Sequence, residues 1–297
     1  MGSQVTLQNQ RFTAKISADG AEIQSLFDRI TQTEFIWQGD PEWWGKHAPI
    51  LFPIIGLLKD GKYRYKGVEY AMPKHGLVRG REWELIEELP VRARFRIKSD
   101  AETRFSYPFE WQLVVTFQLE MDGLHIRYKV RNLGQDEMYF SLGSHPAIRL
   151  PWLPDTEFED HELVFAEEEA WARYPMTDNG LIETTPETLP VENRSLRLRH
   201  ELFARDALIM RGIKSRSVQL RCDGVPEYVE VDLGGAPDLG IWQPEGAPFL
   251  CIEPWFGVND TVDHDQELTH KPGILKLGPG EAFRTAYAIC VREGLPS

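Results

Sequence analysis

Two ionisable side chains in this chain are each followed directly by a proline. Glu253 ends the apolar run Phe-Leu-Cys-Ile-Glu and precedes Pro254, and His145 ends the run Phe-Ser-Leu-Gly-Ser-His and precedes Pro146. Proline has no N–H for a central sheet ladder, so we expect pairing to stop at Glu253 and at His145. Each ionisable side chain would then face the space beyond its strand.

A second histidine, His75, lies in the turn-like stretch Pro-Lys-His-Gly-Leu-Val-Arg, where Gly76 lets the backbone turn. A carboxyl group and two imidazoles in such settings are typical of general acid–base catalysis. A structural interpretation stays open for each of them. Glu253 could cap a neighbouring backbone or pair with an arginine, and a histidine at a strand end could be a hydrogen-bonded core residue.

Sequence motifs for other chemistries are absent. The chain has no His-Glu-x-x-His zinc-protease motif, no Gly-x-Ser-x-Gly elbow, no Gly-Lys-Ser/Thr phosphate loop and no dinucleotide fingerprint. No close spacing of His, Cys and Asp residues requires a metal, and we expect none. Tryptophans such as Trp242 fall in loops or at strand ends, where an indole could stack on a sugar or plug the end of a β core.

The elements that must position these residues are mostly strands. Apolar and polar residues alternate with period two in several stretches, namely residues 12–16, 21–26, 92–98, 111–120 and 124–132, the last two joined by a Met-Asp-Gly turn. Helical spacing is rare, and we expect only short helices at 195–205 and 263–270. Residues 151–160 and 178–193 are expected to be loops. The pattern predicts an antiparallel all-β sandwich or barrel.

The composition restricts the class of protein. With 42% hydrophobic and 27% charged residues, the chain is typical of a folded globular protein. A net charge of −13 disfavours nucleic acids and anionic membranes as partners. The three cysteines form no Cys-x-x-Cys pair, which indicates free thiols in a reducing compartment. We find no signal-peptide-like segment and no membrane span, and therefore expect a soluble cytoplasmic protein, as a monomer or homodimer.

The motifs, taken together and in order, resemble the aldose 1-epimerase (galactose mutarotase) family, in particular its LacX-like branch. The matching segments cover nearly the whole chain and are residues 49–53 with Gly56, 75–79 with Trp83, 144–146, 206–208, and 251–255 with Gly257 and Asp260. The resemblance implies one domain over residues 1–297, built as an antiparallel β-supersandwich with few short helices. It also implies a sugar cleft and no metal or organic cofactor.

The resemblance also implies roles for individual residues. Glu253 matches the general base that takes the proton of the anomeric hydroxyl, and His145 matches the general acid that protonates the ring oxygen. His75 and Asp206 match residues that bind the sugar. An ionised Glu and a protonated His can coexist near neutral pH if each favours the charged state of the other.

One position departs from the family pattern. The family commonly has an arginine after the glycine of the Phe-Pro-x-x-Gly segment, and this chain has Leu57 there. Lys59 or Arg79 could supply the missing cation, or the sugar could differ from galactose and glucose. The leading hypothesis is an aldose 1-epimerase acting on an aldohexose or related free sugar. The alternatives are a non-catalytic sugar-binding or sensing protein, a sugar-phosphate epimerase, and lastly a glycoside hydrolase with Asp206 as the second carboxylate.

Overall fold

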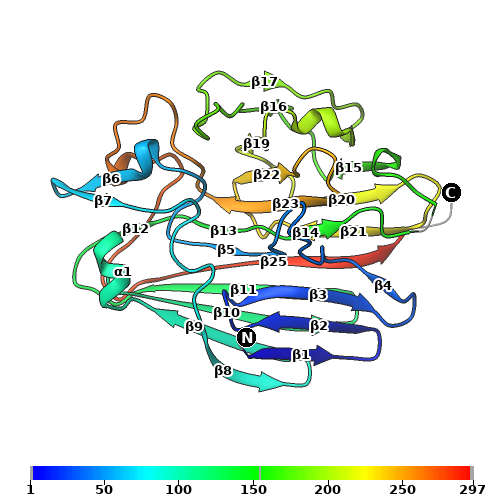
Figure 1. Cartoon of the computed structure of the whole chain (residues 1–297), viewed down its shortest axis with the longest axis horizontal. Helices are drawn as coiled ribbons and strands as arrows, with labels where there is room; N and C mark the ends of the chain where they lie inside the picture. The colour runs from blue at the N-terminus through cyan, green and yellow to red at the C-terminus, as the bar shows by residue number, and fades with distance from the viewer. Residues whose placement is uncertain (1–2, 154, 295–297) are drawn as a thin grey trace.

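The computed structural model describes residues 3–153 and 155–294, and within them antiparallel strands dominate (Figure 1). The largest sheet has nine strands, all paired antiparallel, in the order β18 (Ser195–Arg197), β15 (His161–Phe165), β20 (Ser217–Cys222), β21 (Glu227–Asp232), β25 (Ala282–Glu293), β11 (Gly123–Asn132), β10 (Trp111–Glu120), β9 (Arg92–Lys98) and β8 (Glu84–Leu89).

Two smaller sheets complete the main architecture. A four-stranded sheet contains β1 (Gln4–Gln8), β2 (Phe12–Ser17), β3 (Glu22–Asp28) and β4 (Thr33–Glu34). A six-stranded sheet contains β19 (Leu208–Arg211), β22 (Asp238–Trp242), β23 (Phe249–Phe256), β13 (Leu142–Ser144) and β5 (Ile50–Leu51), with β14 (Ala147–Arg149) also paired to β23. Two-stranded ribbons are formed by β6 (Lys62–Tyr65) with β7 (Val68–Ala71), β12 (Met138–Phe140) with β24 (Leu275–Leu277), and β16 (Ala172–Arg173) with β17 (Glu187–Thr188).

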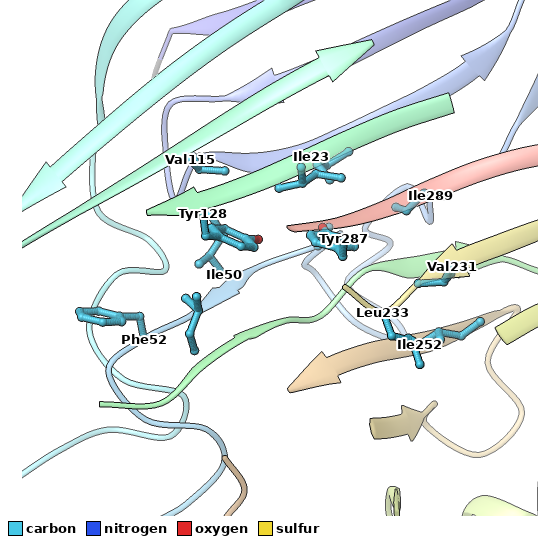
Figure 2. Close-up of a cluster of buried hydrophobic side chains, with 14 of the residues drawn as sticks. Ile23, Ile50, Phe52, Val115, Tyr128, Val231, Leu233, Ile252, Tyr287 and Ile289 are labelled. Atoms are coloured by element: carbon cyan, nitrogen blue, oxygen red, sulfur yellow. The ribbon is translucent and has the colours of Figure 1, made fainter. Parts of the chain in front are cut away.

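The core forms where side chains of all three large sheets meet. Figure 2 shows Ile23 of β3, Val115 of β10 and Ile252 of β23 in one buried cluster. Burial of these apolar faces follows from the period-two alternation: in β9, for example, Ala93, Phe95 and Ile97 are buried while their neighbours are not. The predicted fold class, an antiparallel β-supersandwich, is confirmed.

Several predicted elements are confirmed in place. The strands expected at residues 12–16, 21–26 and 92–98 are β2, β3 and β9. The predicted hairpin is formed by β10 and β11, which pair from Trp111 opposite Asn132 to Glu120 opposite Gly123.

The helix predictions were partly wrong. Residues 195–205 form β18 and the 3₁₀ turn η3 (His200–Phe203), because Leu196 and Leu198 alternate with exposed neighbours as in a strand. Within 263–270 only η4 (Leu268–His270) is helical. The other helices are α1 (Ala101–Ser106), η1 (Lys59–Gly61) and η2 (Phe158–Asp160), the last inside an expected loop. In the part of the chain that is described, no helix is long and apolar enough to cross a membrane.

Candidate active site

The strand β23 carries Glu253 in its interior, which corrects the expectation that the strand ends there. β23 runs on through Pro254 to Phe256, and Pro254 lies opposite Leu239 of β22. The N–H of Ile252 donates to the carbonyl of Pro146 at 3.2 Å, so the nitrogen of Pro254 faces the same side by strand alternation. On that side the register of β13 and β14 with β23 places Ser144, the last residue of β13, opposite Pro254, and the pairing of β13 with β23 stops one residue earlier, at Gly143 opposite Trp255. The proline therefore lies where this ladder ends, while the pairing with β22 on the other side continues.

His145 occupies this interruption. Gly143 lies opposite Trp255 before the break and Ala147 opposite Cys251 after it, so the same register places His145 opposite Glu253. The Nε2 atom of His145 is 3.4 Å from Oε2 of Glu253, and both side chains are buried. The two proline-flanked residues singled out in the sequence thus meet across neighbouring strands.

Two tryptophans enclose the His145 ring. Trp44 stacks on the imidazole, with ring centroids 4.8 Å apart and an interplanar angle of 26°. Trp242, at the end of β22, meets the same ring edge-on at 5.5 Å and 86°. Trp44 and Trp242 in turn contact each other at 5.6 Å. These contacts fix the plane of the imidazole, and both indoles line the adjacent cavity.

His75 is held by a neighbouring backbone segment. The N–H of Gly56 donates to its Nδ1 at 3.1 Å, and the N–H of His75 donates to the carbonyl of Gly56 at 2.9 Å. A neutral His75 ring must therefore carry its proton on Nε2. Gly76 has φ +81°, and a Cβ atom there would lie 2.1 Å from the carbonyl oxygen of Phe52. The turn after His75 consequently requires glycine.

A cavity of about 530 Å³, including its part open to solvent, joins these residues. The predicted site residues that line it are Glu253, His145, His75, Asp206, Arg79 and Trp242. Further residues line the cavity that were not among the predicted site residues, namely Trp44, Lys74, Met176, Ala207, Trp255 and Asn259. Lys74 directly precedes His75, and Trp255 lies two residues after Glu253 on the same face of β23. That closeness was the available signal for those two.

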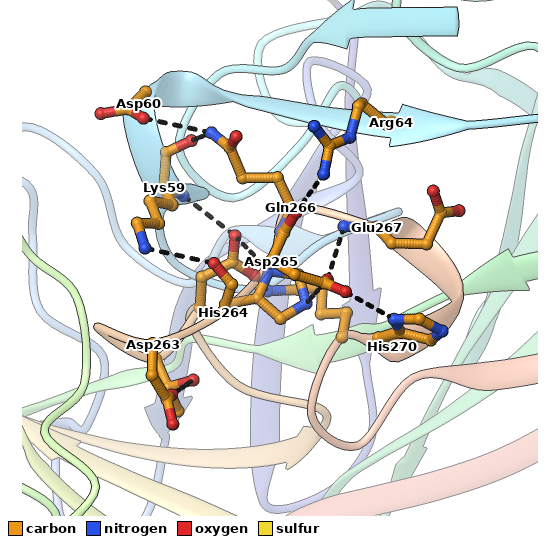
Figure 3. A network of polar contacts seen from close by, with 12 residues as sticks. Lys59, Asp60, Arg64, Asp263, His264, Asp265, Gln266, Glu267 and His270 are labelled. Atoms are coloured by element: carbon orange, nitrogen blue, oxygen red, sulfur yellow. Dashed lines mark hydrogen bonds and ion pairs between the residues drawn. The ribbon is translucent and has the colours of Figure 1, made fainter. Parts of the chain in front are cut away.

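Lys59, which was also predicted to bind substrate, is not among the residues that line this cavity. Its ammonium donates to the carbonyl of Val262 at 2.8 Å. It also donates to the carbonyl of His264 at 3.2 Å (Figure 3). Leu57, which stands where the family commonly has arginine, is half-buried and packs against Gly180, where an added Cβ atom would lie 2.5 Å from Leu57 Cδ1. The cations beside the cavity are therefore Lys74 and Arg79.

Burial dominates the electrostatics of the site. It lowers the pKa of His145 to about 3, and the charges of Lys74 and Arg79 act in the same direction. Burial also raises the pKa of Glu253 well above its usual value, with Asp206 adding to this rise and Lys74 opposing it. Without a ligand, burial thus favours a protonated Glu253 beside a neutral His145. In the ion pair expected from the sequence, the same single proton lies on His145 and Glu253 is ionised.

The pKa of His75 is also lowered well below its usual value, first by burial and then by His145, Lys74 and Arg79. A neutral His75 with its proton on Nε2 is a hydrogen-bond donor and carries no charge. Asp206 is exposed and has φ +65°, and its Oδ1 accepts the N–H of Ala207 at 2.8 Å. The site therefore offers a shared proton, a neutral donor, an exposed carboxylate and two cations around one cavity.

The fold and this arrangement define the class: a β-supersandwich of the galactose mutarotase type. A solved structure from Lactobacillus acidophilus, a galactose mutarotase related enzyme, superposes with a TM-score of 0.93 at 34% identity, covering 98% of each chain. A galactose mutarotase-like protein from Lactobacillus casei gives a TM-score of 0.92 at 30% identity, covering 98% of this chain and 100% of the other.

Sequence comparisons give the family. The family model described as aldose 1-epimerase matches residues 3–272. The plasmid-encoded protein LacX of Lactococcus lactis is 32% identical over 97% of this chain and 99% of its own length. The chain belongs to the aldose 1-epimerase family. This is a family of isomerases, more narrowly epimerases, whose substrates are small sugars.

Proposed function

We propose that the protein is an aldose 1-epimerase that interconverts the α and β anomers of a free aldohexose or a related sugar. The observation that carries this proposal is the buried His145–Glu253 pair, with 3.4 Å between Nε2 and Oε2, beside a cavity lined by polar side chains and indoles. Mutarotation needs a base for one oxygen and an acid for another, and this pair holds one transferable proton between two such groups.

In the proposed reaction Glu253 takes the proton of the anomeric hydroxyl, and the O–H electron pair forms the carbonyl bond. The bond between C1 and the ring oxygen breaks, and the ring oxygen keeps its electron pair and accepts a proton from His145. Rotation about C1–C2 presents the other face of the aldehyde. Ring closure reverses both transfers, so the number of protons on the pair is unchanged over the cycle.

The working form of the pair is the ionised Glu253 with protonated His145, although burial favours the neutral arrangement in the free cavity. The two arrangements differ by moving one proton between Nε2 and Oε2, so a bound sugar need not change the net charge of the site. Sugar hydroxyls next to the pair would stabilise the ionised arrangement through hydrogen bonds. Because burial makes the ionised arrangement costly, each polar group around the pair needs a hydrogen-bond partner when the sugar is bound.

The remaining cavity residues are proposed to hold the sugar. The Nε2–H of His75 donates to the ring oxygen or a neighbouring hydroxyl, and Asp206 accepts from hydroxyls at the exposed side. Arg79 provides the fork of donors that Leu57 cannot provide, while Trp44 and Trp242 present apolar ring faces to the sugar C–H groups.

A second candidate substrate is a phosphorylated sugar, because two cations, Lys74 and Arg79, line the cavity. The phosphate would pair with the exposed ammonium of Lys74. Competition by hexose 6-phosphate against free hexose separates the two candidates. Lys74→Met should weaken a phosphate-bearing competitor by about tenfold or more and change the KM for a neutral hexose much less.

The proposed activity is tested by NMR exchange between anomers of freshly dissolved α-glucose and α-galactose with micromolar protein. An exchange rate above that of buffer alone supports an epimerase and shows which sugar is preferred. Saturable sugar binding, with anomer exchange no faster than in buffer alone, would instead support a sugar-binding or sensing protein and refute catalysis.

A further inference from the structure

A third ligand-forming side chain lies beside the acid–base pair. Cys251 is two residues before Glu253 on the same face of β23, and Ala147, two residues after His145, lies opposite it. One ligand atom each from His145, Cys251 and Glu253 lies within 4.8 Å of the other two, and all three side chains are buried. Residues 145, 251 and 253 show no metal motif in the sequence, because β-sheet pairing brings the histidine to the other two.

The spacing of the acid–base pair also matches the spacing of two ligands on one metal ion. Two ligand atoms held 2.0–2.2 Å from a tetrahedral zinc ion are roughly 3.4 Å apart. The Nε2–Oε2 distance is 3.4 Å, which is long for a hydrogen bond between these groups. Among the residues that the structure describes, Oε2 of Glu253 and Nδ1 of His145 have no hydrogen-bond partner. An unpartnered buried oxygen therefore lies next to an imidazole nitrogen and a thiol.

We propose that His145, Cys251 and Glu253 form a binding site for Zn²⁺, and that Zn²⁺ inhibits the protein by occupying the lone pairs of its acid–base pair. The metal takes one nitrogen, one sulfur and one oxygen ligand, which leaves one of the four tetrahedral positions for water. The metal then occupies the Nε2 lone pair of His145, and its positive charge makes the coordinated carboxylate of Glu253 a much weaker base. The inhibitory part rests on the proposed epimerase function, whereas the binding part does not.

The charges and the ligand types around the site decide which metal ions bind. When Zn²⁺ binds, the thiol of Cys251 and the protonated carboxyl of Glu253 release their protons to solvent, and the resulting thiolate and carboxylate supply two negative charges. The exposed carboxylate of Asp206 adds a third at the cavity. Lys74 and Arg79 line the same cavity and oppose a cation. Sulfur and imidazole ligands favour zinc over hard, oxygen-preferring ions, so Mg²⁺ at the same concentration should neither bind here nor inhibit.

The binding site is tested with Co²⁺ as a spectroscopic substitute for Zn²⁺, using the full-length protein. Wild type should show a thiolate-to-cobalt charge-transfer band that Zn²⁺ abolishes, and Cys251→Ser and Cys251→Ala should lose it. Cys222→Ser is the matched control, because Cys222 is also a buried free thiol but belongs to neither cluster of candidate ligands. Circular dichroism establishes that each variant is folded.

A second cluster of candidate ligands, Asp122, His125 and Cys290, is the competing location. Its carboxylate is already paired, with His125 at 2.9 Å and Arg292 at 3.3 Å. His125→Asn should therefore leave the charge-transfer band and the Zn²⁺ affinity unchanged. A band that persists in both Cys251 variants, or that disappears in His125→Asn, would overturn the proposed site.

The inhibitory part is tested on anomer exchange. Zn²⁺ should inhibit wild type, EDTA should reverse the inhibition, and Cys251→Ser should need at least tenfold more Zn²⁺ for the same effect. Zn²⁺ that binds through Cys251 without slowing exchange would refute inhibition. A protein that binds Co²⁺ through Cys251 but accelerates no sugar would support the metal site and refute the proposed epimerase, so the two failures are distinguishable.

Discussion

Replacing Lys271 by methionine should destabilise the fold strongly, because it leaves a buried carboxylate without its cation. The Nζ atom of Lys271 lies 2.8 Å from Oδ1 of Asp260, and neither side chain has any exposed surface. Oδ2 of Asp260 accepts the backbone N–H of Lys59 at 2.9 Å, and His264 lies 3.3 Å away. This carboxylate therefore joins the segment after Gly56 to the loop after β23, directly after the cavity residue Asn259.

The magnitude follows from the pKa of Asp260. Burial alone would raise it, but His264, Lys271 and the N–H of Lys59 together lower the pKa from 3.8 to about 2. At about 1.36 kcal/mol per pKa unit, this shift corresponds to about 2 kcal/mol of net stabilisation of the carboxylate. Removing one partner of a buried pair typically costs about 3–5 kcal/mol. We expect Lys271→Met to lower the free energy of unfolding by about 3 kcal/mol at pH 7.

Urea unfolding monitored by tryptophan fluorescence measures this loss. The matched control is Lys276→Met, because Lys276 pairs with Glu137 at 2.7 Å while both side chains are about half exposed, and its removal should cost less than about 1 kcal/mol. The lowered pKa of Asp260 stabilises the fold above about pH 4, and this contribution is lost as the pH falls toward 2. The difference between Lys271→Met and wild type should therefore shrink below pH 4. Equal losses for the two lysine variants at pH 7 would refute the reasoning.

Two further predictions concern the site. In Gly240→Ala the new Cβ would lie 2.6 Å from the Trp255 ring, so the ring must move. We expect a loss of about 1–3 kcal/mol in the free energy of unfolding and at least a tenfold lower kcat/KM. The control Gly45→Ala, where the new Cβ would have no atom closer than 4.0 Å, should behave as wild type in both assays. Burial lowers the pKa of His145 to about 3, so the pair should gain no second proton between pH 7 and 5. We therefore expect no fall in kcat/KM as the pH drops through 6.5, the usual histidine pKa, and such a fall would contradict this.

Much of the strand content could be predicted because it depends on local pattern. The alternation in β9 and the turn between β10 and β11 involve neighbours in sequence, and the structure has these elements where they were expected. The residues that line the cavity were found in part for the same reason. His75, His145 and Glu253 each stand beside a glycine or proline that marks a change in the backbone.

The errors come from partners distant in the sequence. Pro254 was expected to end its strand, but β23 keeps its pairing with β22 through Pro254 on the other side. On the side of the proline nitrogen the ladder stops at Gly143 and resumes at Ala147, over a hundred residues earlier in the chain. Spacing in the sequence could not show whether Lys59 or Arg79 supplies the cation beside the cavity. That choice depends on carbonyls of residues 262 and 264, which hold the Lys59 ammonium. The closeness of Cys251 to His145 likewise arises only from strand register.

The central claim is that Glu253 and His145 act as one unit that shares a proton. Its most direct test is kcat/KM for anomer exchange by Glu253→Gln, His145→Asn and the double variant, all checked for folding. We predict that each single variant loses a factor of about 10² or more and that the double variant loses little beyond the more damaged single variant. A single variant within tenfold of wild type, or losses that multiply in the double variant, would contradict the account.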